Sequence, residues 1–187
     1  MTNSTTLTTR LARTGDAPAL VALVNSAYRG DSSRAGWTTE ADLLDGQRTD
    51  EKALAEFIDR GETVGDRAML MYEHDNRPIA CVQLEKRADS AYLGMLTISP
   101  TLQNTGLGKR LLAAAEMHVS RVWRSTRMTM TVIAQRPELI AWYERRGYVQ
   151  TGESAAFPYG DLRFGDPKRP DIWFIVLAKR LDSTRVP

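Results

Sequence analysis

The sequence predicts an α/β fold in which helices cover a mixed sheet that includes three successive antiparallel strands. Residues 67–99 alternate apolar and polar side chains, which is the period of a β-strand, and two short turns divide them into three successive strands. Segments on both sides repeat apolar side chains every three or four residues, which is the period of an amphipathic helix. A chain that combines these two periods forms a sheet with helices packed against it.

Length and charge limit the class of protein. The 187 residues predict one domain, with a core over about 7–181 and short flexible termini. The 25 basic and 23 acidic side chains nearly cancel, so the chain lacks the broad positive field that nucleic-acid binding needs. We therefore expect no nucleic-acid partner.

Cysteine, histidine and hydropathy add two exclusions. One Cys and two His cannot complete a zinc site, and a single Cys cannot form an internal disulfide, which predicts a metal-free protein of the reducing cytoplasm. No apolar run approaches the roughly 20 residues of a membrane span, and residues 1–7 lack the features of a signal peptide. We therefore expect a cytoplasmic protein that does not associate with membranes.

The chain is predicted to begin with a strand and a helix. Residues 7–11 alternate apolar and polar side chains, which predicts a strand. Pro18 then marks the first turn of a helix, because proline at this position loses no helical hydrogen bond.

Two further helices are predicted before the three strands. Thr39 and Asp42 have the spacing of a capping box, which predicts a short helix that stops near Gly46. Asp50 is the expected cap of the next helix, and Gly61 lies just beyond its expected end.

Helices and strands alternate after the three strands. A long amphipathic helix is predicted from Leu107, with Val122 on its buried side. The elements predicted next are a strand over 128–134, a helix over 137–146, a strand over 148–153, an irregular loop over 157–171 and a strand over 172–181. The last strand is almost continuously apolar, which predicts a central position in the sheet.

The turn before the long helix is the most informative segment. A strand that runs through a glycine-containing turn into a helix leaves free N–H groups at the positive end of the helix dipole, where a phosphate binds. Glycine at Gly106 and Gly108 lets such an anion approach the backbone. A Walker A loop would need glycine in place of Gln103 and Ser or Thr in place of Arg110, and a dinucleotide fingerprint would need glycine in place of Leu111. The sequence fits neither motif.

The remaining pattern, Q-x-x-G-x-G after a strand that ends in Ile-Ser-Pro, resembles the signature of the GNAT superfamily of N-acetyltransferases, where it holds the pyrophosphate of acetyl-coenzyme A (acetyl-CoA). Residues 141–148 resemble the second motif of the superfamily, an aromatic–Tyr pair before a Gly–aromatic pair. The resemblance covers roughly 7–181, and its specific motifs lie within 93–152. It implies a mostly antiparallel sheet of about seven strands, in which the strand bearing 95–98 splays from the strand over 128–133 and the cofactor lies in the gap.

The resemblance also implies an enzyme and assigns roles. An amine would attack acetyl-CoA directly in a ternary complex. The backbone N–H of Leu96 would donate to the acetyl carbonyl oxygen, and the main chain of Ile98 would pair with the pantetheine arm. Tyr143 stands where many members carry the general acid that protonates the departing thiolate. The expected cofactor contacts are Leu96, Thr97, Ile98, Gln103, Asn104, Thr105, Gly106, Leu107, Gly108 and Lys109.

The general base is not evident. The histone-acetyltransferase branch carries a carboxylate four residues before the oxyanion donor, and this chain has Tyr92 there. Glu85 on the neighbouring strand is the candidate substitute, although a solvated charge at a strand end is the better interpretation. At pH 7 a lysine amine with a pKa of about 10.4 is neutral in about four molecules per ten thousand, whereas an α-amine near 7.8 is neutral in more than a tenth. An enzyme without a strong base therefore favours an α-amine or a similar acceptor.

The acceptor is expected to be an amine of a small molecule or peptide, bound between the segment after the first helix and the loop before the last strand. Arg136 is expected to be exposed, and the alternative is that it contacts the cofactor or a carboxylate. Three alternatives stay open: a non-catalytic acyl-CoA binding or sensing module, an N-acyltransferase that uses a longer acyl-CoA, and, for assembly, a homodimer. The candidate acceptor-binding residues, which are polar or aromatic as in ligand pockets, are Tyr28, Ser33, Trp37 and Tyr159.

Overall fold

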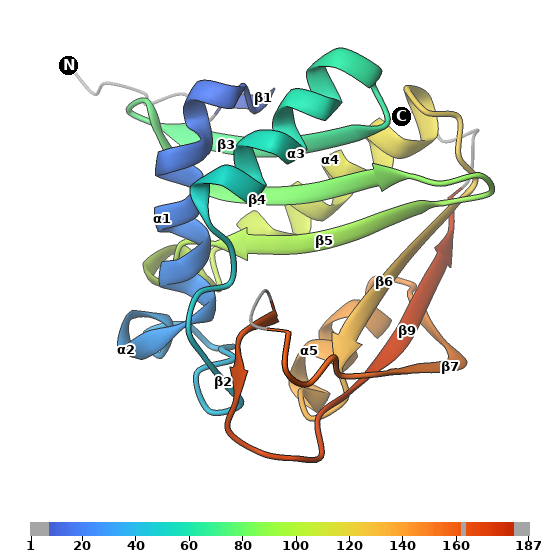
Figure 1. Cartoon of the computed structure of the whole chain (residues 1–187). Helices are drawn as coiled ribbons and strands as arrows, with labels where there is room; N and C mark the ends of the chain where they lie inside the picture. The colour runs from blue at the N-terminus through green and yellow to red at the C-terminus, as the bar shows by residue number, and fades with distance from the viewer. Residues whose placement is uncertain (1–7, 162–163, 182–187) are drawn as a thin grey trace.

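The computed structural model describes residues 8–161 and 164–181 and has a seven-stranded sheet at its centre (Figure 1). The strand order is β1-β3-β4-β5-β6-β9-β7, and every neighbouring pair is antiparallel except β5 and β6. The predicted sheet is therefore confirmed, with the apolar last strand in an interior position. The strands are β1 (Thr8–Leu11), β3 (Arg67–His74), β4 (Arg77–Lys86), β5 (Ala91–Ile98), β6 (Arg127–Ile133), β7 (Val149–Ala156) and β9 (Trp173–Arg180).

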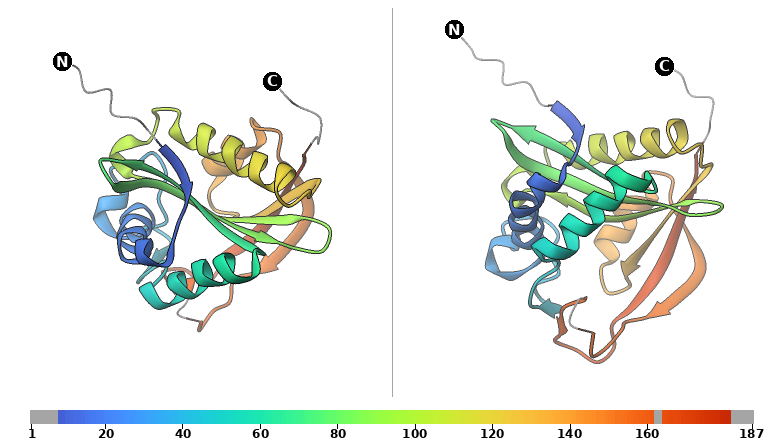
Figure 2. Two further views of the ribbon diagram at one scale, coloured as in Figure 1. Left: turned by 90° about the horizontal axis from the view of Figure 1, so that it is seen from above. Right: turned by 45° about the horizontal axis from the view of Figure 1, so that its top comes forward.

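Helices cover both faces of β3, β4 and β5 (Figure 2). Helices α1 and α3 pack on one face, and α4 packs on the other. None of the helices in the described ranges is long and apolar enough to cross a membrane. The helices are α1 (Ala17–Tyr28), α2 (Gly30–Ser33), α3 (Glu51–Val64), α4 (Leu107–Arg121) and α5 (Pro137–Glu144).

Burial on both faces explains why β3 and β4 are rich in apolar residues. Successive side chains of a strand point to opposite faces of the sheet. Met69, Met71 and Cys81 belong to the hydrophobic cluster with α1 and α3, whereas Leu70 and Val82 belong to the cluster with α4. Two cores therefore hold this half of the sheet, one on each face.

Strands β5 and β6 separate soon after they meet. They are paired at Ala91–Met128 and Tyr92–Thr129, and beyond these pairs β5 continues beside β4 while β6 continues beside β9 (Figure 1). The predicted splay is confirmed. Met95 has a φ of 44°, and the register between β4 and β5 shifts around it, as in a β-bulge. The bulge lies in the part of β5 that no longer pairs with β6.

The helix predicted to stop near Gly46 does not form. The Thr39 hydroxyl accepts a hydrogen bond from the Ala41 N–H at 3.0 Å, which closes a tight turn instead of capping a helix. Strand β2 (Leu44–Asp45) then pairs with β8 (Asp166–Pro167). The local capping pattern does not produce a helix here because a helix would break the tertiary contacts of these residues, such as the pairing of β2 with β8.

Two helix ends also differ from prediction. Helix α3 passes through Gly61 and ends at Gly65, whose φ of 78° gives the left-handed cap. A Cβ at Gly61 would lie 2.6 Å from the Arg67 carbonyl oxygen, so glycine here permits the helix to approach β3. Helix α4 ends before Val122, which is 63% exposed, and Trp123 is buried instead.

Replacing Gly61 tests this close approach. Alanine is favoured over glycine in a helix interior by about 1 kcal/mol, yet overpacking in Gly61→Ala is expected to lower the free energy of unfolding by about 1–3 kcal/mol. Urea denaturation measures the change. Gly15→Ala is the control because a Cβ at Gly15 meets no atom within 4 Å. A Gly61→Ala protein as stable as the wild type would show that α3 tolerates a greater separation from β3.

Candidate active site

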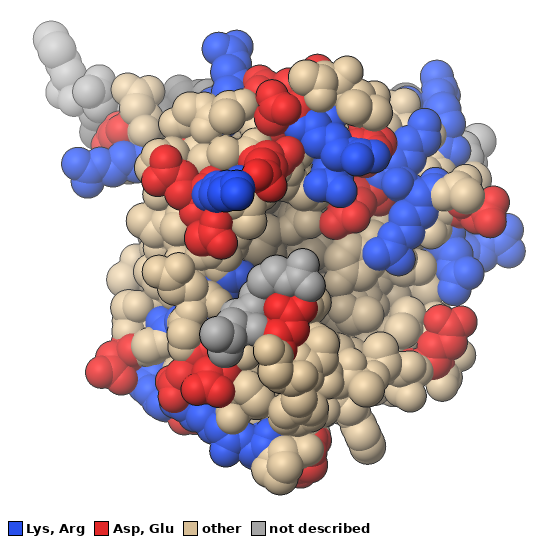
Figure 3. Space-filling view, in the orientation of Figure 1, with Lys and Arg blue, Asp and Glu red and all other residues tan. Residues whose placement is uncertain are grey.

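Two adjoining cavities lie where β5 and β6 separate. The first, of about 290 Å³, is called the loop cavity and is lined by the turn before α4 and by one face of α5. The second, of about 330 Å³, is called the strand cavity and is lined by β5, β6 and residues 155–158. Figure 3 shows a hollow in this face of the molecule, with basic and acidic side chains interspersed around it. The residues common to both cavities are Tyr28, Leu96, Arg136, Leu139 and Tyr143.

The turn before α4 has the backbone of an anion site. Asn104 and Gly106 both have positive φ, 65° and 85°. Within the described chain no backbone carbonyl accepts from the N–H groups of residues 104–109, and the first bonded amide is that of Arg110, which donates to the Gly106 carbonyl oxygen at 3.2 Å. These N–H groups are therefore available to a ligand at the positive end of the α4 dipole.

Gln103 stabilises this turn through its side chain. Its Oε1 accepts from the backbone N–H of Trp37 at 2.9 Å, and its Nε2 donates to the Ile98 carbonyl oxygen at 3.5 Å. Trp37 consequently lines the loop cavity and not the strand cavity, where an acceptor residue was expected. The segment after the first helix thus contributes to the predicted cofactor side.

Eight of the ten expected cofactor contacts line the loop cavity. Thr105 and Leu107 do not: the Thr105 hydroxyl donates to the Leu102 carbonyl oxygen at 2.7 Å, and Leu107 is buried in the core beneath α4. The eight that line the cavity are Leu96, Thr97, Ile98, Gln103, Asn104, Gly106, Gly108 and Lys109.

Arg146 is a cation of the loop cavity that the sequence analysis did not identify. Its guanidinium lies 3.5 Å from the centroid of the Trp142 ring, and Nη1 donates to the Trp142 carbonyl oxygen at 2.6 Å. Burial lowers the pKa of Arg146, and its buried Nε has no hydrogen-bond partner among the described residues. The signal was the spacing of Trp142 and Arg146, four residues apart at the end of a helix.

Tyr143 lies in the wall that the two cavities share. Its side chain is buried and packs edge to face against Trp142 and Tyr148, at centroid distances of 5.0 and 5.7 Å. Burial raises the pKa of Tyr143, so the phenol is protonated at neutral pH. Tyr28 lies nearby and donates its hydroxyl proton to the Leu96 carbonyl oxygen at 3.1 Å, and burial raises its pKa to about 12.

A buried ion cluster forms one wall of the strand cavity. The Glu40 carboxylate binds Arg136 at 2.9 Å and also binds Arg29, and all three side chains are buried. Burial pushes the pKa of Glu40 upward, but the nearby Arg136, Arg29 and Arg48 outweigh this effect and hold the pKa below its ordinary value. The expectation that Arg136 is exposed was wrong, because its guanidinium binds the buried carboxylate of Glu40, which lies 96 residues away in the sequence.

Three other predicted site residues do not line either cavity. The Ser33 hydroxyl donates to the Gly30 carbonyl oxygen at 2.7 Å, inside the first turns after α1. The Tyr159 hydroxyl accepts from the Ile172 N–H at 2.7 Å and fastens the loop before β9. The Glu85 carboxylate accepts from Gln83 at 2.8 Å, on a part of β4 outside the cavity walls. Of the four candidate acceptor-binding residues, Tyr28 lines the strand cavity, as do Phe157 and Phe164 from the loop that was expected to bind the acceptor.

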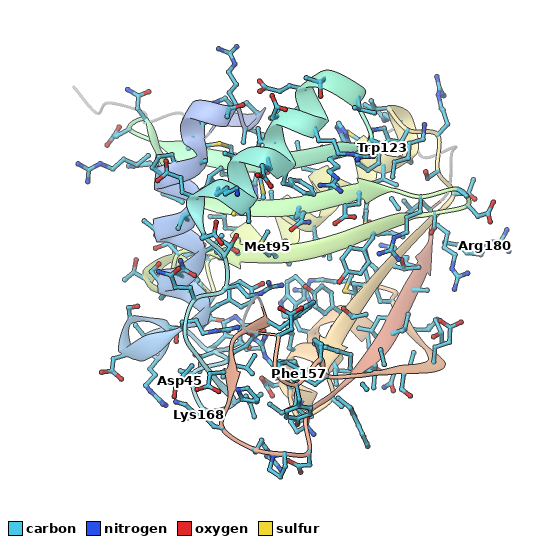
Figure 4. All side chains as sticks on the ribbon, viewed as in Figure 1. Asp45, Met95, Trp123, Phe157, Lys168 and Arg180 are labelled. Atoms are coloured by element: carbon cyan, nitrogen blue, oxygen red, sulfur yellow. The ribbon has the colours of Figure 1, made fainter. Side chains whose placement is uncertain are left out.

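Apolar side chains from β5 and from the loop after β7 line the strand cavity, and an ion pair links the two strands of the small sheet. Figure 4 shows Met95 on β5 above this region and Phe157 below it, and both side chains line the cavity. In the small sheet the Lys168 ammonium, directly after β8, lies 2.8 Å from the Asp45 carboxylate of β2. Within residues 8–161 and 164–181, no cluster of three His, Cys, Asp or Glu has the geometry of a metal site.

Comparison with known proteins gives matches to one family. A family model described as an acetyltransferase (GNAT) domain matches residues 38–158. A curated relative, 5-NmdU N-acetyltransferase of Pseudomonas phage PaMx11, is 30% identical over 83 residues, which are 44% of this chain and 56% of that protein. The match thus spans about half the length of the relative.

Solved structures share the fold at low sequence identity. The ribosomal-protein-S18-alanine N-acetyltransferase of Escherichia coli matches with a TM-score of 0.67, 18% identity and 95% coverage of both chains. The protein yncA of Salmonella typhimurium, solved with its cofactor acetyl-CoA, matches with a TM-score of 0.67, 17% identity, and coverage of 97% of this chain and 98% of that one.

Removing the Glu40 charge tests the ion cluster. Glu40→Gln leaves two buried arginines without their anion and is expected to lower the free energy of unfolding at pH 7 by about 3–5 kcal/mol. Asp42→Asn, which removes an exposed partner of Arg34, is the control and should change stability little.

The effect of Glu40→Gln should depend on pH. The folded pKa of Glu40 is lowered, so its contribution is fully present above the unfolded pKa of about 4.3 and is lost as the pH falls through the folded value. Urea denaturation between pH 7 and pH 3 measures the difference between the proteins. A difference that vanishes already at pH 6 would contradict the assigned pairing.

Proposed function

The chain belongs to the GNAT acetyltransferase family, and from this premise we propose that it is an enzyme that transfers an acetyl group from acetyl-CoA to an amine. The observation that carries the proposal is the row of N–H groups at residues 104–109, which have no backbone acceptor in the described chain and lie beside the separated strands. A diphosphate and an extended thiol-bearing arm match these two features in charge and in shape.

The chain's own groups fit the cofactor at three places. The N–H groups of the turn, with Lys109 and Arg146, would hold the diphosphate, because Asn104, Gly106, Gly108, Lys109 and Arg146 line the loop cavity. The edge of β5 from Leu96 to Ile98 lies outside the pairing with β6 and would bind the pantetheine arm as an added strand. When bound, acetyl-CoA supplies an activated acetyl thioester. The bulge at Met95 turns the following backbone, and the Leu96 N–H would donate to the acetyl oxygen.

The reaction balances without a metal or a redox group. The amine nitrogen forms a bond to the acetyl carbon and the carbon–sulfur bond breaks. The Tyr143 hydroxyl gives its proton to the departing thiolate, the amine proton passes to solvent, and a proton from solvent then restores the Tyr143 phenol. Burial raises the pKa of the Tyr143 phenol, and the same surroundings also disfavour the coenzyme A thiolate. Because both anions are destabilised, the proton transfer from the phenol to the thiolate stays feasible.

The acceptor must reach the site with its amine already neutral. The carboxylate in the strand-cavity wall is Glu40, whose lowered pKa and two arginine partners make it a poor base. No His lines either cavity in the described chain. An amine of low pKa, such as an α-amine, therefore suits this site better than a lysine side chain.

The direct test is release of coenzyme A thiol with a panel of amines that includes amino acids, polyamines, peptides and 5-NmdU. Succinyl-CoA and longer acyl-CoA thioesters compete with acetyl-CoA in a second series. Turnover with acetyl-CoA supports the proposal. Cofactor binding without turnover of any amine would support the sensing module in its place.

Tyr143→Phe tests the general acid. We expect kcat to fall by about 10²–10⁴-fold, with the Kd for acetyl-CoA unchanged, because only the proton donor is removed. Tyr72→Phe is the control, since Tyr72 is buried in the core and lines neither cavity. Equal kcat values for Tyr143→Phe and the wild type would remove Tyr143 from the reaction.

Arg146→Gln tests the diphosphate site. Losing a charge-assisted hydrogen bond of about 1.5–3 kcal/mol is expected to raise the Kd for acetyl-CoA by at least about tenfold, measured by calorimetry. Arg145→Gln is the matched control, because the neighbouring Arg145 is exposed and lines neither cavity. Equal effects of the two substitutions would mean that only the overall charge matters.

A further inference from the structure

The strand cavity has an excess of positive charge. Its charged lining residues are Arg29, Arg48, Arg136 and Glu40, three cations and one anion. The whole chain has a net charge of only +2 over 187 residues, so this local excess does not follow from composition. A cavity with unbalanced buried cations is stable when a ligand or solvent supplies the missing negative charge.

The buried pair is under-satisfied even with Glu40 in place. Arg29 and Arg136 are 5% and 6% exposed, and the Nε atom of each is buried with no hydrogen-bond partner among the described residues. Their terminal nitrogens bind Glu40, Thr38 and the Phe164 carbonyl oxygen. Glu40 is the one buried carboxylate that both guanidinium groups share, and the half-exposed Glu138 lies 4.0 Å from the Arg136 Nε and outside the cavity lining, so a positive potential remains at the cavity wall.

Arg48 is the cation that remains available. No carboxylate of the described chain forms a salt bridge with its guanidinium, which lies 5.6 Å from the centroid of the Tyr28 ring. Asn25 holds its backbone: Oδ1 accepts from the Arg48 N–H at 2.7 Å, and Nδ2 donates to the Thr49 carbonyl oxygen at 2.9 Å. An otherwise irregular segment is therefore fixed so that a half-buried arginine without a carboxylate partner lines the cavity.

The rest of the wall is apolar and aromatic. Phe157 stacks on Phe174 at a centroid distance of 5.7 Å, and Phe164 packs edge to face on Phe157 at 6.4 Å. All three line the cavity. Such a wall accepts a planar or hydrocarbon portion of a ligand, whereas the arginines accept its charge.

We propose that the acceptor of this enzyme carries an anionic group as well as its amine, and that Arg48 binds this group while the aromatic wall holds the part between the two. The proposal rests on the proposed acetyl transfer for the identity of the amine, but the anion site follows from the cavity itself. It favours acidic acceptors over polyamines, because a polycation would meet three arginines. Carboxylate and phosphate share the required chemistry.

The test compares two acceptors that differ only in charge, 3-(aminomethyl)benzoate and 3-(aminomethyl)benzamide. We expect the wild type to have a kcat/KM at least about tenfold higher for the benzoate. In Arg48→Gln, kcat/KM should fall for the benzoate and stay unchanged for the benzamide, so that the preference is lost. Arg48→Lys should keep part of the preference, and Arg48→Glu should favour the benzamide. Arg121→Gln, at the exposed end of α4, is the control. A phosphate ester of the same amine shows which anion binds better.

Binding of probes without an amine separates this proposal from acetyl transfer. Benzoate, phenyl phosphate and benzamide are titrated into the protein with and without saturating coenzyme A, which fills the diphosphate site. Anion binding that is lost in Arg48→Gln but kept in Lys109→Gln supports the proposal even if no amine turns over. Equal binding of charged and neutral probes, or a charge preference that survives in Arg48→Gln, overturns it even if acetyl transfer is established.

Discussion

The separation of β5 from β6 is the constraint on which the site depends. A strand in the middle of a sheet uses its backbone groups for pairing, and unpaired groups must find other partners. Here two central strands stay paired for only two residue pairs and then part, so one edge of β5 lies free inside the molecule. The bulge at Met95 and the N-terminus of α4 lie at the same opening. Most polar groups proposed to act on the cofactor therefore belong to the backbone.

Charged side chains surround the opening that the backbone of β5 and β6 creates. Glu40 comes from the segment between α2 and β2, Arg29 follows α1, and Arg136 precedes α5, so one ion cluster joins three segments around the opening. Two arginines around the buried Glu40 carboxylate stabilise this wall and, with Arg48, leave the cavity lining positive. The loop cavity is also basic, through Lys109 and Arg146, but it lies at the other end of the shared wall. The protein thus has one positive site on each side of Tyr143, the loop cavity and the strand cavity.

Local patterns were enough to predict the sheet, most helices and the turn before α4. The alternation in residues 67–99 and the glycines at 106 and 108 are local signals, because strand pairing and anion binding place their demands on neighbouring residues. The errors arose where residues that are distant in the sequence determine the local structure. The spacing of Thr39 and Asp42 is a valid capping signal, yet the neighbouring Glu40 is buried against Arg29, 11 residues away in the sequence, and Arg136, 96 residues away. Arg48 carried no local signal at all, because only the fold brings it to the cavity.

The position of β9 affects how the chain assembles during synthesis. This strand follows β6 and β7 in the sequence but lies between them in the sheet, so neither has its main partner until the segment Trp173–Arg180 has left the ribosome. The half built from β1 to β5 and α4 depends mainly on earlier contacts and can condense first. The pairing of β6 and β7 with β9 therefore forms last, and a nascent chain that stalls before this strand exposes the unpaired backbone N–H and C=O groups of the β6 edge to other proteins.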